Sequence, residues 1–287
     1  MTRKAILAVG AAGQFAGLAV TALSQRGARV RGFVRNAKQG NEAQRLGAEE
    51  VVIGDLRDLR SVDAALAGVD SVFYIAPAFL PDEAEVGKRF VEAVERSGAR
   101  RIVFSSVIHP VLAELVNHAA KAPVEAAILD SGLEYVLLHP ALYFQDYARA
   151  WPTVIESGVL AEPWAVESRF SRVDYRDVAD VAAMALLEDR LLCGTFELCA
   201  DGVLSREDVA ELIADVTGHE ISARRIDLDT VGEDANVMRP MFAHYDLHGL
   251  VGSSITLRAI LAREPRTLRA YFEELARKSE RASPTRR

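Results

Sequence analysis

A glycine-rich stretch near the start of the chain has the composition of a phosphate-binding turn. Residues 10–17 read GAAGQFAG and follow the short apolar run Ala5–Val9. Residues without bulky side chains allow backbone N–H groups and the first turn of a helix to approach a pyrophosphate. The alternative is a tight turn with a structural role alone. We predict dinucleotide binding here, with contacts from five residues of the turn: Gly10, Ala12, Gly13, Gln14 and Phe15.

The basic residues that follow bear on which dinucleotide binds. An NAD site usually places an Asp or Glu against the ribose 2′-hydroxyl about 20 residues after the glycines, whereas an NADP site places an Arg near the 2′-phosphate. No acidic residue precedes Glu42, and the run Arg29–Val34 is followed at once by Arg35. A guanidinium group binds phosphate with two parallel hydrogen bonds. We therefore expect NADP(H) in preference to NAD(H), with Arg35 as the discriminating residue; the alternative is a solvated, basic strand edge.

Two further short segments fall where predicted strands end. Asp55 and Leu56 follow the run Val51–Ile53, and Asp55 either accepts a hydrogen bond from the adenine amino group or caps a turn. Ala76 and Pro77 follow the run 71–75, and residues this compact let the chain pass close beside a cofactor. We expect all four residues to contribute to cofactor binding.

The elements that must position these residues repeat along the first half of the chain. Apolar, largely β-branched runs recur at the spacing of βαβ units; they are Ala5–Val9, Arg29–Val34, Val51–Ile53, Ser71–Ile75, Arg101–Phe104 and Glu134–Leu138. Helical patterns lie between them, as where Val86, Phe90 and Val94 share one face ahead of Gly98. Because crossovers between parallel strands are right-handed, the pattern predicts an α/β fold with a Rossmann-type, doubly wound, mostly parallel sheet.

The pattern changes after about Tyr143, where helical signals dominate. One more strand is predicted at Thr195–Cys199, and Ser205 with Asp208 forms a capping box at the start of a helix. We predict a dinucleotide-binding domain over 1–145, a small mixed substrate lobe over 146–278 that is partly interleaved with the first, and a flexible tail over 279–287.

Composition excludes several classes of function. The chain has 287 residues with 34 Lys+Arg against 41 Asp+Glu, a net charge of −7, which argues against direct nucleic-acid binding. Cys193 and Cys199 are too few for a disulfide framework and lack zinc-ligand spacing, so we expect no metal site and a cytoplasmic location. The uncharged stretch 5–25 is interrupted by glycines, so we expect neither a signal peptide nor a membrane span. An oligomer is compatible with the sequence.

Six segments of the chain together resemble the NmrA-like group of atypical short-chain dehydrogenases/reductases. They are GAAGQFAG, VRGFVRN, GDLRDLRSVDAALAGVDSVFY, RIVFSSV, KAPVEAAILDSGLEYVLLHPALYFQDY and VDYRDVADVAAMAL. The resemblance implies a Rossmann-type cofactor domain, a small C-terminal substrate lobe and NADP(H) binding, with Ser105, Pro140 and Tyr143 near the cofactor. Ala16 stands where the family usually has Gly, a mild departure.

The resemblance also raises the question of catalysis. Short-chain dehydrogenases generally carry Tyr-x-x-x-Lys, in which the tyrosine supplies a proton. Lys121 fits the lysine, which places Asn117 at the tyrosine position, and an amide cannot titrate. Lys121 either binds the nicotinamide ribose or pairs with Glu125 at i, i+4 on a solvated helix face. Ser105, Ser106 or Val107 occupies the position of the family's serine.

Three of the six histidines lie near predicted strand ends or near Lys121, and an imidazole exchanges protons near neutral pH. They are His109, His118 and His139. We expect His118, the nearest to Lys121, to act with it in catalysis. His109, Phe144, Tyr147 and Trp164 are expected to form a largely apolar substrate pocket; the alternative for each is an ordinary structural role.

Two functions fit these observations. The first is an NAD(P)H-dependent oxidoreductase that transfers hydride to a quinone, an enone or another conjugated or aromatic carbonyl compound, for instance in tailoring a secondary metabolite. Such acceptors delocalise charge, so that a tyrosine acid is dispensable. The second, favoured by Asn117, is a non-catalytic NADP(H)-binding redox sensor that acts through a protein partner.

Overall fold

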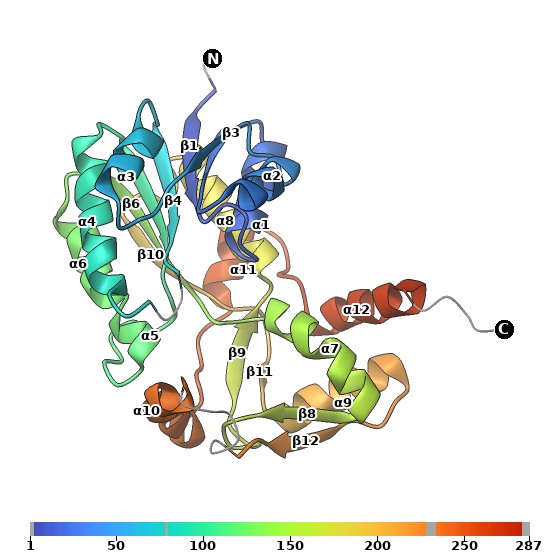
Figure 1. Ribbon diagram of the computed structural model, residues 1–287. Helices are drawn as coiled ribbons and strands as arrows, with labels where there is room; N and C mark the ends of the chain where they lie inside the picture. Colours follow the sequence, from blue (N-terminus) through green and yellow to red (C-terminus); the bar gives the residue numbers. More distant parts are fainter. Residues whose placement is uncertain (1–2, 78–79, 228–233, 283–287) are drawn as a thin grey trace. The chain divides into compact units, whose positions relative to one another are not determined.

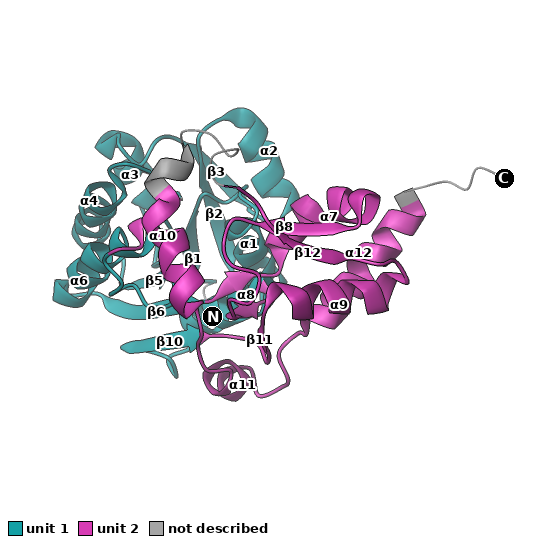
Figure 2. Cartoon of the chain, turned by 90° about the horizontal axis from the view of Figure 1, so that it is seen from below, with its two compact units in different colours: residues 1–113, 117–140, 175–197 teal, residues 114–116, 141–174, 198–287 magenta. Residues whose placement is uncertain are grey.

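The computed structural model describes residues 3–77, 80–227 and 234–282. They form two compact units (Figure 2). Unit 1 comprises residues 1–113, 117–140 and 175–197, and unit 2 comprises residues 114–116, 141–174 and 198–287. The predicted division near residue 145 compares with a change of unit after Pro140, and residues 175–197 belong to unit 1.

Unit 1 is built on one seven-stranded sheet with the order β10-β6-β5-β4-β1-β2-β3. The strands are β1 (Ala5–Val9), β2 (Arg29–Val34), β3 (Glu50–Ile53), β4 (Ser71–Ile75), β5 (Arg101–Ser105), β6 (Glu134–Pro140) and β10 (Gly194–Leu198). Neighbours from β3 through to β6 pair in parallel. The order of β1 to β6 is that of a doubly wound Rossmann sheet, so the predicted fold class and its first six strands are confirmed.

Helices cover both faces of this sheet. The helices of unit 1 are α1 (Ala16–Gln25), α2 (Ala37–Arg45), α3 (Leu59–Leu66), α4 (Glu83–Arg96), α5 (Val116–Ala119, whose first residue belongs to unit 2), α6 (Ala122–Asp130) and α8 (Tyr175–Leu187). On one side α3, α4 and α6 pack side by side, and on the other α1 packs against α8 (Figure 1). Strands enclosed in this way are buried on both faces, which is why β1 is a continuous apolar run and residues 102–104 of β5 are apolar without alternation.

Unit 2 contains two small sheets. One has the order β11-β9-β7, and the other pairs β12 with β8 in parallel. The strands are β7 (Leu142–Tyr143), β8 (Val159–Glu162), β9 (Phe170–Val173), β11 (Val203–Leu204) and β12 (Ser222–Arg225), and the helices are α7 (Gln145–Ser157), α9 (Arg206–Thr217), α10 (Asp234–His248), α11 (Ile255–Leu261) and α12 (Leu268–Ala282). The predicted capping box is confirmed at the start of α9, where the Ser205 side chain accepts from the Asp208 N–H and the Asp208 carboxylate accepts from the Ser205 N–H.

The later part of the chain differs from the sequence-based prediction in three respects. The strand predicted at Thr195–Cys199 forms as β10, but it lies at the edge of the large sheet. The five strands of unit 2 have only two to four residues each, which is too short for alternation to show in a sequence. Residues 279–282, predicted as part of a flexible tail, continue α12, and residues 283–287 lie outside the described residues.

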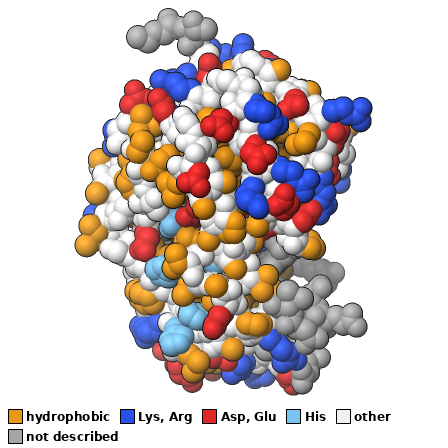
Figure 3. Space-filling model, turned by 90° about the vertical axis from the view of Figure 1, so that its left-hand side faces the viewer, with side chains coloured by type: hydrophobic (Ala, Val, Ile, Leu, Met, Phe, Trp, Pro, Cys, Tyr) orange, Lys and Arg blue, Asp and Glu red, His pale blue; other side chains and the backbone are white. Residues whose placement is uncertain are grey.

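The surface and the helices agree with the charge balance of the chain. Acidic side chains are interspersed with basic ones on the face shown in Figure 3. On α4, for example, Glu85 pairs with both Lys88 and Arg89. Over the residues described, no helix is long and apolar enough to cross a membrane.

Arg101, the first residue of β5, is a fully buried charge with several partners. Its Nε and Nη2 donate to Glu134 on β6 at 2.9 and 2.7 Å, and Nη2 also donates to Asp189 at 2.6 Å. Its Nη1 donates to the carbonyl oxygens of Ala185 and Glu188 at 2.8 and 2.6 Å. This guanidinium group therefore ties two strands to the end of α8.

Replacing Arg101 by Met should lower the free energy of unfolding by about 2–3 kcal/mol, because charged hydrogen bonds to buried carbonyl groups are lost. Arg100 is the matched control, since it pairs with the same Glu134 but its side chain is 57 % exposed. Arg100→Met should change the free energy of unfolding by less than about 1 kcal/mol. Urea unfolding measures both. Equal losses for the two variants would contradict the role assigned to Arg101.

Candidate functional site

The glycine turn connects β1 to α1 at the carboxyl edge of the sheet. Gly10 has a φ of +66°, a conformation that strains any residue with a side chain. A Cβ at Gly17, the second residue of α1, would lie 2.7 Å from Cδ1 of Leu46. The first glycine is thus favoured by the backbone conformation, whereas a side chain at the last would require the Leu46 side chain to move.

The turn directly before α1 is open to a ligand. Gly10, Gly13 and Gln14 are exposed, and Phe15 at the N-cap position accepts no hydrogen bond through its side chain. By contrast, α2 is capped by the Asn36 side chain, which accepts from the Gln39 N–H. An exposed, uncapped helix N-terminus attracts anions through its N–H groups and its dipole. The turn therefore fits the pyrophosphate of a dinucleotide.

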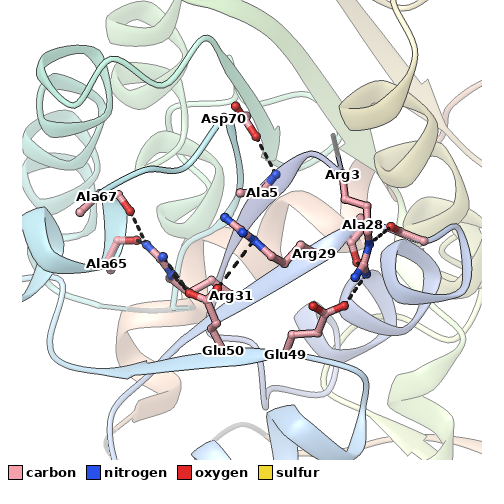
Figure 4. A network of polar contacts seen from close by, with 11 residues as sticks. Arg3, Ala5, Ala28, Arg29, Arg31, Glu49, Glu50, Ala65, Ala67 and Asp70 are labelled. Atoms are coloured by element: carbon pink, nitrogen blue, oxygen red, sulfur yellow. Dashed lines mark hydrogen bonds and ion pairs between the residues drawn. The ribbon is translucent and has the colours of Figure 1, made fainter. Parts of the chain in front are cut away.

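The arginines on and directly after β2 separate into two groups: Arg29 and Arg31 on the strand, and Arg35 after it. Arg31 donates through Nε to Glu50 at 2.9 Å and through Nη1 to the Ala65 and Ala67 carbonyl oxygens, and Arg29 also faces Glu50 (Figure 4). The Arg31 hydrogen bond lowers the pKa of Glu50. These two arginines therefore support the sheet.

Arg35, by contrast, lies at the carboxyl end of β2 and is exposed. Its backbone N–H donates to Gln39 Oε1 at 2.9 Å, and this hydrogen bond does not involve the guanidinium group. Of the arginines on and directly after this strand, Arg35 alone lies on the same edge as the glycine turn, where a 2′-phosphate would bind.

The segments after β3 and β4 complete this edge. Asp55 is exposed, and its Oδ1 accepts from the Arg57 N–H at 2.8 Å, so it does cap a turn. Leu56 is half-buried beside it. Ala76 is buried at the end of β4, and Pro77 next to it is exposed.

Ser105 and Tyr175 form a buried hydroxyl pair at the end of β5. The two oxygens are 2.8 Å apart, and the Phe15 ring of the glycine turn lies 4.9 Å from the Tyr175 ring, centroid to centroid. Burial raises the pKa of Tyr175, so the phenol keeps its proton at neutral pH. Tyr175 was not predicted as a site residue from the sequence, although it lies in the segment VDYRDVADVAAMAL.

A second buried cluster joins the ends of β5 and β6 to α6. Glu125 Oε1 accepts a hydrogen bond from the Ser106 hydroxyl and lies 2.9 Å from His139 Nε2. All three residues are buried. The first turn of α6 is thereby fixed at the carboxyl edge of the sheet, next to Pro140, the last residue of β6.

Lys121, directly before α6, pairs with Glu83, the first residue of α4. Nζ donates to Glu83 Oε1, and the two side chains are 6 % and 1 % exposed. The alternative in which Lys121 pairs with Glu125 on a solvated face is therefore wrong. Burial raises the pKa of Glu83, and Lys121 opposes that shift. No local pattern marks Glu83, because it is 38 residues away from its partner.

His118 is buried, and burial lowers its pKa to about 4. Its Nδ1 lies 3.2 Å from the carbonyl oxygen of His109. A neutral imidazole with this pKa cannot donate a proton effectively near pH 7, which argues against the predicted catalytic role. His109 has a φ of +52°, and its Nδ1 lies 3.6 Å from Glu197 Oε1.

The predicted aromatic substrate residues lie in unit 2. Phe144 and Tyr147 are buried in its core, with ring contacts to Tyr271 and Phe272 respectively. Their burial agrees with the structural alternative and leaves little ring surface for a substrate. Trp164 is half-buried; its ring packs against three aromatic rings and lies under the Arg206 guanidinium group. Tyr143 is half-buried in β7.

Comparison with known proteins gives consistent results. The model of the NmrA-like family matches residues 2–273. The NAD(P)H azoreductase of Xenophilus azovorans is 24% identical over 285 residues, which covers 93% of this chain and 96% of that protein. The NADPH-dependent quinone oxidoreductase of Escherichia coli, solved with NADPH, superposes with a TM-score of 0.83 at 21% identity, covering 94% of this chain and 99% of that one. Triphenylmethane reductase of Citrobacter sp. gives 0.84 at 18% identity, covering 96% and 99%.

Lowering the pH from 7 to 5 should reduce the free energy of unfolding through His118. The folded-state pKa lies near 4, below the ~6.5 of an exposed imidazole, so the unfolded chain takes up the proton first. The stabilisation that neutral His118 gives the folded state is fully present above pH 6.5. It is lost as the pH falls toward 4, which lowers the free energy of unfolding by on the order of 3 kcal/mol.

Urea unfolding of the wild type and His118→Gln at pH 7, 6 and 5 measures this contribution. Glu83, whose pKa is raised, adds a slope of the opposite sign in both proteins, so it cancels in the difference. An identical pH dependence in both proteins would rule out a buried, neutral His118.

Proposed function

The chain belongs to the NmrA-like family. From that membership and from the geometry of the site, we propose that it is an NAD(P)H-dependent reductase of quinones and other conjugated or aromatic small molecules. The observation that carries the proposal is the exposed glycine turn directly before α1, a helix without a side-chain N-cap, at the carboxyl edge of a Rossmann sheet. The names of the similar proteins support it, since they are reductases of azo compounds, quinones and triphenylmethane dyes.

The nicotinamide cofactor supplies a hydride when it is bound, and the chain's own residues bind and orient it. The start of α1 holds the pyrophosphate, and Arg35 selects NADP(H) by binding the 2′-phosphate. Asp55 and Leu56 border the adenine. Ala76 and Pro77 leave room for the cofactor, while Ser105, Lys121 and Pro140 contact its nicotinamide end.

Catalysis without a tyrosine acid restricts the substrates. Asn117 cannot release a proton, and the pKa of His118 is too low for it to serve as the acid at neutral pH. A quinone or enone spreads the negative charge that hydride addition creates, so that water can protonate it after the transfer. Tailoring of an aromatic secondary metabolite is one setting that provides such substrates. The chain has only two cysteines, the exposed Cys193 and the buried Cys199, too few for a disulfide framework, which supports a reducing, cytoplasmic location.

The second candidate function is a redox sensor without turnover. Asn117 favours it, because an amide side chain at the position of the family's tyrosine cannot act as an acid. A sensor must bind NADPH and NADP⁺ with different affinities in order to shift a conformational equilibrium.

We expect the purified chain to oxidise NADPH when a quinone or enone is added, and not when cyclohexanone, which is not conjugated, is added. Loss of NADPH absorbance measures turnover, and calorimetry with NADPH and NADP⁺ measures affinity. Binding of both forms with distinct affinities, without turnover on any acceptor, would favour the sensor. No binding of either form would refute both functions.

Arg35→Gln should raise the dissociation constant for NADPH at least about tenfold, because a charge-assisted contact to phosphate contributes about 1.5–3 kcal/mol. The constant for NADH should change little, since NADH lacks the 2′-phosphate. Arg45→Gln, on a 73 % exposed residue at the far end of α2, is the control and should leave both constants unchanged. Equal weakening for both cofactors would contradict the role of Arg35.

A further inference from the structure

Glu83 and Lys121 are brought together by an unusually close approach of two helices. Gly87 lies one turn after Glu83 on α4, and Val124 lies nearly one turn after Lys121 in α6. A Cβ at Gly87 would lie 2.4 Å from Val124 Cγ2, so only glycine permits this approach. Because the glycine contact and the ion pair join the same two helices one turn apart, the packing of α4 on α6 fixes the lysine relative to the carboxylate.

The position of Lys121 is also fixed relative to the sheet. Glu125, one turn further along, accepts a hydrogen bond from Ser106, the residue after β5, and faces His139 on β6. These contacts hold the beginning of α6 at the carboxyl ends of two central strands, which is where doubly wound sheets bind their ligands. The ammonium group of Lys121 is therefore held near the proposed cofactor site.

The pair is poorly suited to a purely stabilising role. Glu83 Oε2 and the hydroxyl of Tyr74 are buried and have no hydrogen-bond partner among the residues described. Burial and the charge of Glu83 both raise the pKa of Tyr74, so the phenol stays neutral. Arg101 is buried to the same degree, yet it is bonded through Nε and both terminal nitrogens. A buried charge with unmet hydrogen bonds costs stability, and such a cost is common where function requires it.

We propose that Glu83 is a positioning residue for Lys121, and that this incompletely bonded pair is retained because it orients the lysine toward the bound dinucleotide. The inference rests on the proposed function, since it requires that the chain bind NADPH or NADH. It assigns to Glu83 a part in cofactor affinity that acts through Lys121.

A double-mutant cycle on cofactor affinity tests this coupling. Glu83→Gln should raise the dissociation constant for NADPH about tenfold, and Lys121→Met by at least as much. The two changes together should have no more effect than Lys121→Met alone, because Glu83 acts through the lysine. Glu85→Gln is the control on the same helix, where an exposed ion pair is lost, and it should leave the constant unchanged.

Thermal unfolding separates positioning from structural support. The double variant Glu83→Leu with Lys121→Met should melt at or above the wild-type temperature and still bind NADPH weakly, because replacing a buried ion pair by apolar groups is often neutral or stabilising. A lower melting temperature with unchanged affinity would overturn the inference, as would affinity losses that multiply. If the wild type binds neither NADPH nor NADH, the proposed function itself fails; if it binds and Glu83→Gln binds equally tightly, only the role of Glu83 fails.

Discussion

Parallel pairing around β1 is the constraint on which the location of the candidate site depends. Because β1 pairs in parallel with β2 on one side and with β4 on the other, all segments that leave these strands do so at one edge. This places the glycine turn, Arg35 and the end of β4 together, although they are up to 67 residues apart along the chain. The same constraint separates Arg29, at the amino end of β2, from Arg35, which follows its carboxyl end, because the two ends of a strand lie at opposite edges of the sheet.

Three buried charged groups of unit 1 differ in how completely they are hydrogen-bonded. Arg101 donates to side chains and carbonyl groups on several elements, which is the arrangement expected of a group that supports the fold. Glu125 accepts from Ser106 and faces His139, and it thereby locks α6 to the sheet. Glu83 has one lysine partner, and its second carboxylate oxygen has none in the part of the chain that the structure describes. Buried charged groups can therefore have different roles. Complete hydrogen bonding is typical of groups that stabilise the fold, such as Arg101, whereas incomplete bonding is consistent with the role proposed for Glu83.

The sequence allowed much of unit 1 to be predicted, because its signals are local. Fully buried strands such as β1 appear as continuous apolar runs, and the glycine turn is contiguous. In unit 2 the capping box of α9 is equally local, since it spans four residues. The pairing of Lys121 with Glu83 and of Ser105 with Tyr175 could not be predicted, because these partners are 38 and 70 residues apart and meet only through helix and sheet packing. The two-residue strand β7 is likewise set by its partner β9, since two residues carry no period of their own.

The return of residues 175–197 to unit 1 affects how the chain folds during its synthesis. A nascent chain of 145 residues already contains β1 to β6, but it lacks α8, the helix that packs on α1, and the edge strand β10. The helix layer formed by α1 and α8 thus stays incomplete until residue 187 has left the ribosome. The sheet stays incomplete until residue 198 has left it. Unit 1 cannot finish folding before the segment 141–174 of unit 2 has been made, so the order of translation couples the two units.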